Sequence, residues 1–344
     1  MNLRRFLLRR FLLSAVTLFG ATVAVFVLTH ILPGNPAKYR AGAFAPQEAV
    51  EEIEREMGLD KPLVLQFGRY LNGLLHGDLG KSWSTRRPVA EDLAQRLPAT
   101  LELAVTSFLL AVLIALPLGI AAAVNKDSLV DHVCRVLTTF SSSVAIFWLG
   151  TMLIYVIYYE WHWAAAPTGR LDVGLSPPQT ITGFYVLDSL LTANMDTLGS
   201  SLKHLFLPAV TLSFAVIGII AKGARTSMLE VLRMDYIRTA SALGKTRWQA
   251  VIDDGLQNAL IPVVTILALV FGFLMAGNII VEMLFAWPGI GQYAWNALLT
   301  KDFDSVQGFM LFTATLYVVL NLLADVLYGL IDPRIRLGGQ GQAA

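Results

Sequence analysis

Long apolar stretches alternate with shorter polar segments along the whole chain. Six of these stretches approach or exceed the roughly 20 residues that a helix needs to cross the hydrocarbon of a bilayer. They cover residues 11–29, 99–124, 136–159, 205–221, 259–281 and 306–330. The pattern predicts an all-α integral membrane protein with six transmembrane helices. Because six is an even number, both termini are expected on the same side of the membrane.

The composition is that of a membrane protein and argues against a soluble domain and a nucleic-acid-binding protein. Of the 344 residues, 55% are hydrophobic and 15% are charged, whereas a soluble domain carries about 25% charged residues. The net charge of +1 lacks the basic excess expected of a nucleic-acid-binding protein. The single cysteine, Cys134, excludes an intrachain disulfide, and the sequence has no Cys/His cluster of the kind that binds zinc.

The distribution of Lys and Arg predicts the orientation. These residues gather before the first stretch, between the second and third, between the fourth and fifth, and after the sixth. The short segments on the opposite side carry few of them, and positive residues are retained in the cytoplasm. Both termini are therefore expected to be cytoplasmic.

This topology divides the chain into segments. We expect a cytoplasmic N-terminus at 1–10, a first span at 11–32, a helical extracytoplasmic cap at 33–98, a core of five helices at 99–331 and a cytoplasmic tail at 332–344. In the cap, Pro46 and Gly58 bracket a predicted helix from 47 to 57, and further helices are expected at 63–75 and 89–97. The cap is either a spacer or a docking surface for a soluble partner.

No group of residues in the sequence predicts bond-making chemistry. Gly80-Lys81-Ser82 resembles the end of a phosphate-binding loop, but Leu75 stands where that motif requires glycine. The histidines are scattered over loops and helix ends, at His30, His76, His132, His162 and His204. We therefore expect neither catalytic residues nor a metal site in this chain.

The longest cytoplasmic segment, 222–258, holds the most informative pattern. Thr239-Ala240-Ser241 is followed three residues later by Gly244, and Pro262 comes eighteen residues after that glycine. Glycine accepts a sharp turn with positive φ, so two short helices are expected to meet at Gly244. Small residues at 240–242 would leave a smooth surface for the groove of a partner. The alternative is an amphipathic helix lying on the membrane surface.

This segment resembles the EAA loop of permease subunits of ATP-binding-cassette importers, in the form found in peptide importers. Other segments resemble the first permease of dipeptide and oligopeptide importers: His30-x-Leu32-Pro33-Gly34, Gly77-Asp78-Leu79-Gly80, Phe285-Ala286-Trp287-Pro288-Gly289-Ile290-Gly291 and Asp332-Pro333-Arg334-Ile335-Arg336. Ile181-Thr182-Gly183-Phe184 resembles the dipeptide branch and the related antimicrobial-peptide-uptake branch more closely. The resemblance covers residues 1 to about 337. Ser241 and Leu243 depart from it because basic residues are usual there, as do Asp253 and Asp254 at positions where His or Arg is common.

The resemblance implies a type I importer permease fold in the bacterial inner membrane, with a periplasmic loop at 160–203 and a small periplasmic insertion between helices 1 and 2. It implies a second homologous permease, two cytoplasmic ATP-binding subunits that hold ATP and magnesium, and a periplasmic peptide-binding protein. The cargo would be dipeptides or short peptides. The ATPase-coupling residues it implies are Asp235, Tyr236, Arg238, Thr239, Ala240, Ser241, Gly244, Asn258 and Pro262.

Polar residues within the apolar stretches are candidates for the translocation path or its gate. Asn278 and Glu282 are four residues apart, as are Asn321 and Asp325, so each pair would share one helix face. The alternative is that they form hydrogen bonds between helices. Different cargo, namely antimicrobial peptides, haem, glutathione or nickel, stays open, as do a secondary transporter and a membrane scaffold.

Overall fold

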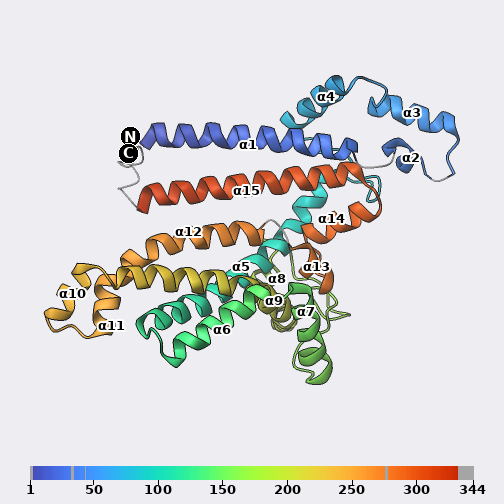
Figure 1. Ribbon diagram of the computed structural model, residues 1–344. Coiled ribbons are helices and arrows are strands. Elements are labelled where there is room, and N and C mark those ends of the chain that lie inside the picture. The colour runs from blue at the N-terminus through green and yellow to red at the C-terminus, as the bar shows by residue number, and fades with distance from the viewer. Residues whose placement is uncertain (1–2, 32–34, 43, 276–277, 332–344) are drawn as a thin grey trace.

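The computed structural model describes residues 3–31, 35–42, 44–275 and 278–331, without the side chains of residues 3–7, 30, 241, 247 and 324–331. The motif residues 32–34 and the predicted tail 332–344 lie outside it. In the described part the secondary structure is helical, apart from one isolated bridge between Lys81 and Pro88. The start of α1 (Leu3–Ile31) and the end of α15 (Phe303–Ile331) lie at the same end of an elongated bundle (Figure 1).

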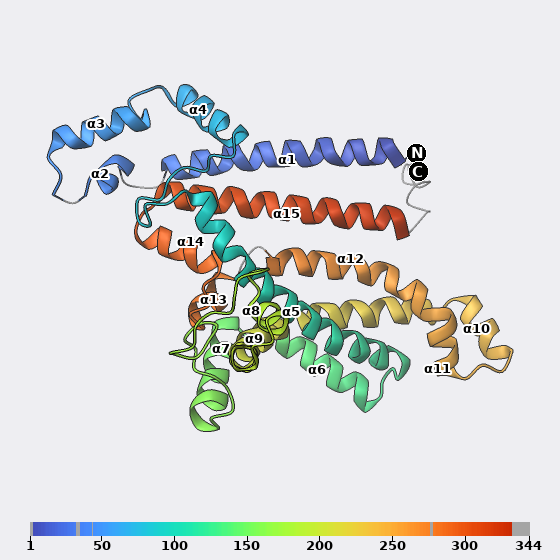
Figure 2. The ribbon, with the colours of Figure 1, turned by 180° about the vertical axis from the view of Figure 1, so that it is seen from behind.

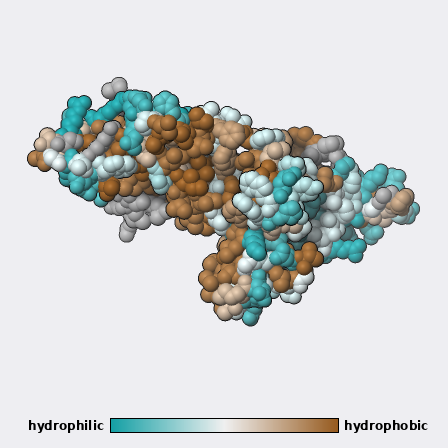
Figure 3. Space-filling view, turned by 90° about the horizontal axis from the view of Figure 1, so that it is seen from below, coloured by the Kyte–Doolittle hydropathy of each residue, from teal (hydrophilic) through white to brown (hydrophobic). Residues whose placement is uncertain are grey.

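Several helices are long and apolar enough to cross a bilayer. Within the described residues there are five such segments, and a bent pair of helices would make a sixth. The five are Leu8–Thr29, Val89–Val124, Met195–Val231, Ala250–Met275 and Phe303–Leu323. A hydrophobic band crosses the middle of the face seen in Figure 3, with hydrophilic residues toward both ends. These findings confirm the predicted class of helical, multi-span membrane protein.

The third apolar stretch, predicted as one span, is broken. α6 (Leu129–Ser143) is followed by α7 (Ile146–Leu153) and the π-helix η1 (Ile154–Glu160), and the two parts make an angle of 104°. Near the break, the Ser141 hydroxyl donates to the Phe214 carbonyl and accepts from the Gly218 N–H of α9, which joins α6 to that helix. α6 ends at Ser143, and Val144 takes an extended conformation.

Two helices are longer than predicted. α5 (Val89–Val124) joins the expected cap helix at 89–97 to the second span, continuing through Pro98. α9 (Met195–Val231) extends the fourth span in both directions from a start capped by Asn194, whose side chain accepts from the Thr197 N–H. The loop predicted at 160–203 is therefore irregular only as far as Phe184, after which come α8 (Tyr185–Leu191) and the start of α9.

The remaining helices complete the bundle and the cap. α12 (Leu256–Met275), α13 (Ile279–Leu284) and α14 (Ile290–Leu299) precede α15. The cap holds α2 (Pro36–Ala41), α3 (Gln47–Met57) and α4 (Leu63–Leu75), and lies at the end of the bundle opposite the start of α1 (Figure 1). α3 ends as predicted at Gly58, which has φ 70°. Phe26 of α1 packs against Phe67 of α4, with ring centroids 5.1 Å apart.

The centre of the core is the packing of α5 against α9. Ala111, Ala115 and Ala122 of α5 are completely buried. A Cβ atom on Gly119 would lie 2.5 Å from the Ala221 carbonyl oxygen of α9, so glycine is required there. Small residues allow the two backbones this close approach, which is the common way for membrane helices to associate.

Candidate functional site

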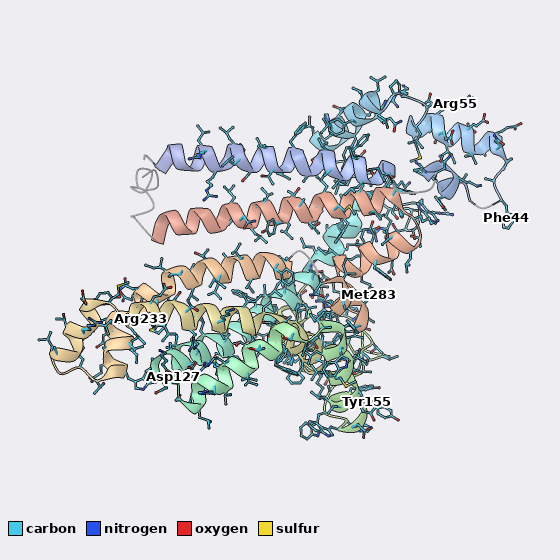
Figure 4. All side chains as sticks on the ribbon, viewed as in Figure 1. Phe44, Arg55, Asp127, Tyr155, Arg233 and Met283 are labelled. Carbon is cyan, nitrogen blue, oxygen red and sulfur yellow. The ribbon has the colours of Figure 1, made fainter. Side chains whose placement is uncertain are left out.

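The predicted turn at Gly244 lies at the end of the bundle that carries the start of α1, and Figure 4 labels Arg233 just before it. α10 (Asp235–Ala242) leads to Gly244, which has φ +90°, and α11 (Arg247–Gln249) follows, continuing into the π-helix η2 (Ala250–Gly255). We call residues 235–255 the coupling hairpin. Its turn is closed by the Lys245 N–H, which donates to the Ala240 carbonyl at 3.2 Å. The predicted pair of short helices meeting at this glycine is confirmed.

One side of the coupling hairpin is fixed to the bundle. Ile237 and Ala240 are buried in a cluster with Met228 and Val231 of α9. The same cluster includes Val124, the last residue of α5, and Ala259 of α12. Ala240 therefore does not belong to the smooth outer surface expected from the sequence, because the helical repeat turns it inward. α10 packs mainly against η2, and its buried residues belong to a cluster that also holds residues of α5, α9 and α12.

The other side of the coupling hairpin is open. Asp235, Arg238 and Thr239 are exposed, and a Cβ atom on Gly244 would meet nothing within 4 Å. Leu243 is 81% exposed and Trp248 is 46% exposed. Ser241 lies on α10, but its side chain is outside the described atoms. An exposed turn with large apolar residues is typical of a surface that contacts another protein.

The acidic residues that depart from the family pattern have partners within the coupling hairpin. The Lys245 ammonium lies 2.7 Å from an oxygen of Asp254 and 3.4 Å from one of Asp253. The hydrogen bond to Asp254 is the main cause that raises the pKa of Lys245. The Asn258 amide donates to the Tyr236 hydroxyl at 3.2 Å, and Pro262 lies one turn further along α12. These contacts brace the hairpin and neutralise charge internally.

Glu282 lies at the opposite end of the bundle and is completely buried. Its carboxylate accepts from the Thr100 hydroxyl at 2.7 Å and from the Gln292 N–H at 2.8 Å. Thr100 in turn accepts from the Ile290 N–H at 2.9 Å. Asn278 does not extend a face with Glu282 but caps α13, accepting from the Val281 N–H at 3.3 Å. The carboxylate thus joins α5, α13 and α14.

The second polar pair is remote from the first. Asn321 is half-buried in α15, eighteen residues after Phe303, which is a rise of roughly 27 Å. Asp325 lies on the same helix, and its side chain is outside the described atoms. The four candidates for a path or gate therefore do not form one cluster among the described side chains.

The chain matches a known family of transport proteins over most of its length. Residues 115–337 match the family described as binding-protein-dependent transport system inner membrane component, and residues 3–104 match the N-terminal region of such components. The chain belongs to this family of inner-membrane transport components. The fold is accordingly the type I permease fold of ATP-binding-cassette importers, and the protein is a multi-pass protein of the inner membrane.

Individual relatives of this family member match over nearly its whole length. The probable D,D-dipeptide transport system permease protein DdpB of Escherichia coli K12 is 46% identical over 320 residues, covering 93% of this chain and 94% of that protein. The dipeptide permease DppB of the same strain is 40% identical over 337 residues, covering 96% and 98%. The glutathione permease GsiC of E. coli O6:H1 is 36% identical over 331 residues, with the same coverage.

An ion pair that the sequence did not reveal lies near Glu282 in this permease. Glu102 of α5 and Arg170, both buried, form a hydrogen-bonded salt bridge. Arg170 also donates to the Gly183 carbonyl at 3.0 Å, and Glu102 accepts from the Val186 N–H at 2.8 Å. A carboxylate in an apolar stretch requires a partner, so Glu102 in the second apolar stretch could have indicated a buried ion pair. Nothing local indicated which cation it pairs with.

The segment Ile181-Thr182-Gly183-Phe184 is organised by one carboxylate. Asp188 of α8 accepts from the N–H groups of residues 181, 182 and 183 and from the Thr182 hydroxyl. Burial raises the pKa of Asp188, but these hydrogen bonds outweigh it and hold the pKa below its ordinary value. The segment is therefore a carboxylate-held turn that ends the irregular part of the loop.

The cap contains a basic cleft of about 560 Å³. Its lining includes three cations, Arg40, Lys81 and Arg86, and two aromatic rings, Tyr39 and Trp83. Lys81 and Ser82 of the Gly80-Lys81-Ser82 segment are part of the lining, and Ser82 donates to Asp302 at 2.6 Å. A hydroxyl held by a carboxylate does not suit a phosphate, and the excess of positive charge suits an acidic protein surface.

Proposed function

We propose that this chain is the permease subunit of an ATP-driven importer that moves dipeptides or short peptides from periplasm to cytoplasm. The observation that carries the proposal is the braced coupling hairpin, which is open on one side and anchored to three long helices on the other. The chain would supply no catalytic residue and would bind no ATP or magnesium, which belong to the ATPase subunits. Both termini and the coupling hairpin would be cytoplasmic, and the cap periplasmic.

Two surfaces of the chain, the coupling hairpin and the cap, indicate which partners it would bind. Two cytoplasmic ATP-binding subunits would engage the pair of coupling hairpins, one from this chain and one from a second homologous permease. A periplasmic peptide-binding protein would dock on the cap, where the basic cleft offers a complementary surface. Thr239 and Arg238 would contact the ATPase because both are exposed on α10.

Transport would proceed by alternating access. ATP binding closes the ATPases and displaces α10, and the buried contacts of Ile237 and Ala240 pass this displacement to α5, α9 and α12. The cavity between the permeases then faces the periplasm and receives the peptide, and hydrolysis restores the inward-facing state. The ATPases would make different contacts with the permease in the two states. ATP binding therefore changes the relative free energies of the inward-facing and outward-facing states, which drives the change.

Dipeptide cargo is favoured over the alternatives by the names of the relatives. The two E. coli K12 proteins named for dipeptide transport are 46% and 40% identical to this chain, and the glutathione permease is 36% identical. A secondary transporter would take up peptide without ATPases, and a scaffold would not take it up. Copurification of an ATPase with this chain separates the importer from both.

The test of the proposal is the substitution Gly244→Leu. A side chain there is strained at φ +90° and protrudes from the open surface, so we expect ATP hydrolysis to continue while peptide uptake into proteoliposomes is lost. Gly174→Leu is the matched control, because Gly174 has φ +98° and open space but lies in the loop at the opposite end. Normal uptake by the Gly244 variant would contradict the coupling role, provided that the variant inserts into the membrane as the wild type does.

A further inference from the structure

α7 and η1 form an arm that leaves the bundle sideways. The spans run along the length of the bundle, and the arm makes an angle of 104° with α6, which packs alongside α9. Figure 1 and the reverse view in Figure 2 show the arm pointing away from the other helices, and Figure 4 labels Tyr155 toward its tip. Because the spans cross the membrane, an element perpendicular to them lies near the membrane plane.

The inner side of the arm is fixed to the core. A Cβ atom on Gly150 would lie 2.4 Å from Leu284 of α13, so α7 approaches this helix closely. Ile146, Leu153 and Ile157 pack against the central core cluster. The direction of the arm is therefore set by packing.

The outer side of the arm is a row of exposed aromatic and apolar side chains. Trp148, Met152, Tyr155 and Tyr159 are spaced as on one helix face, and their exposed fractions are 47%, 38%, 51% and 64%. The chain continues into Trp161 and Trp163, which are also exposed. Residues 144 to 159 include no charged residue. Such a surface is too apolar for water.

The kind of side chain and its position indicate what covers this surface. Trp and Tyr concentrate at the boundary between the hydrocarbon and the headgroups, where a ring is partly dry and its polar atom is hydrated. The arm lies at the end of the bundle opposite the start of α1, because it contacts α13 and leads to Gly169, whose N–H donates to the Phe285 carbonyl. Its 15 residues are fewer than the roughly 20 needed for a crossing.

We propose that α7 and η1 form an interfacial helix that lies in the membrane plane, with the row from Trp148 to Tyr159 in contact with phospholipid at the boundary between acyl chains and headgroups. The arm is a lateral anchor that fixes the depth and tilt of α6 and the core. Because the row from Trp148 to Tyr159 carries no charge, its contact does not require anionic lipid. The proposed function would place the arm in the outer leaflet, since it puts this end of the bundle in the periplasm; that assignment alone rests on the proposed function, and the anchor itself is independent of transport.

The test measures membrane depth at four sites on the arm. Cys134 is the only cysteine, so Cys134→Ser gives a background for single cysteines at positions 148, 152, 155 and 159. Each is labelled with a nitroxide in the full chain, in nanodiscs of phosphatidylcholine, and its depth is measured from collisions with oxygen and with a water-soluble nickel chelate. Leu113 on α5 and Val173 in the loop, both largely exposed, provide the hydrocarbon and water references.

We expect all four labels at one interfacial depth, with a spread of no more than about 5 Å, one helical turn. A helix that crosses the membrane would instead show a gradient of up to about 16 Å from 148 to 159 and overturn the proposal. Water-like values, or protection from both reagents by a partner protein, would overturn it too. Quenching of the native tryptophans by lipids brominated at shallow and deep acyl positions checks depth without cysteine variants, and absence of shallow quenching from Trp161 and Trp163 also counts against the anchor.

Discussion

Glu282 of α13 is a carboxylate that accepts hydrogen bonds from donors on two other helices, α5 and α14. The Thr100 hydroxyl and the Gln292 N–H both point at it, and Gly289 leaves room for its oxygens. Replacing it removes the acceptor and leaves buried donors unpaired, each at a cost of about 1–3 kcal/mol. The residue acts first as a structural link between α5, α13 and α14.

We predict that Glu282→Ala lowers the melting temperature of the detergent-solubilised protein and that Glu282→Gln lowers it less. Glutamine keeps the size and one acceptor oxygen, whereas alanine also leaves a cavity. Glu56→Ala, at an exposed position on α3, should leave the melting temperature unchanged. Equal melting temperatures for Glu282→Ala and the wild type would show that the network carries little stability.

Some individual residues of the site could be predicted from the sequence and others could not. Gly244 was accessible because a positive φ is a local requirement that a single residue type satisfies best. The partner of Glu102 was not accessible, since Arg170 is 68 positions away and the pairing depends on how the loop folds back. The four-residue spacing predicted that Asn278 shares a helix face with Glu282. In the structure, Asn278 is instead the N-cap residue at which α13 begins.

At the scale of elements, the loop before α8 is held down by the pair of Arg170 and Glu102. Removing one member of a buried ion pair costs about 3–5 kcal/mol, while replacing both with apolar residues costs far less. We predict that Arg170→Met speeds hydrogen exchange in residues 161–184 and that Arg170→Met with Glu102→Leu restores part of the protection. Exchange that is equally fast in the single and double variants would exclude the pair as the anchor.

Helix existence was predictable from apolar stretches, but helix ends and directions were not. Hydropathy could not detect the break after Ser143, because the chain stays apolar beyond it, from Val144 to Tyr159. Nor could it show that α5 continues through Pro98, which sequence rules treat as a boundary.

At the scale of the whole molecule, the coupling hairpin and the cap lie at opposite ends of the bundle, where the proposed partners would bind. The basic cleft of the cap should attract an acidic region of the binding protein, and the attraction should weaken with salt. We predict that Arg40→Glu and Arg86→Glu slow association of the purified binding protein, with the larger effect at low ionic strength. Arg55→Glu, on α3 outside the cleft, is the control. If the cleft variants associate at the wild-type rate, the cleft does not bind the binding protein and the cap is a spacer.

The Gly119 contact between α5 and α9 limits how the permease can move. Backbones in direct contact have no side-chain layer between them that could slide, so the two helices behave as one rigid body. Each has about 36 residues, a length of roughly 54 Å, and together they reach from the loop-bearing end to the coupling hairpin. In the transport cycle proposed above, the pair would therefore move as one unit, and motion of the hairpin would reach the loop-bearing end without being absorbed by sliding between α5 and α9.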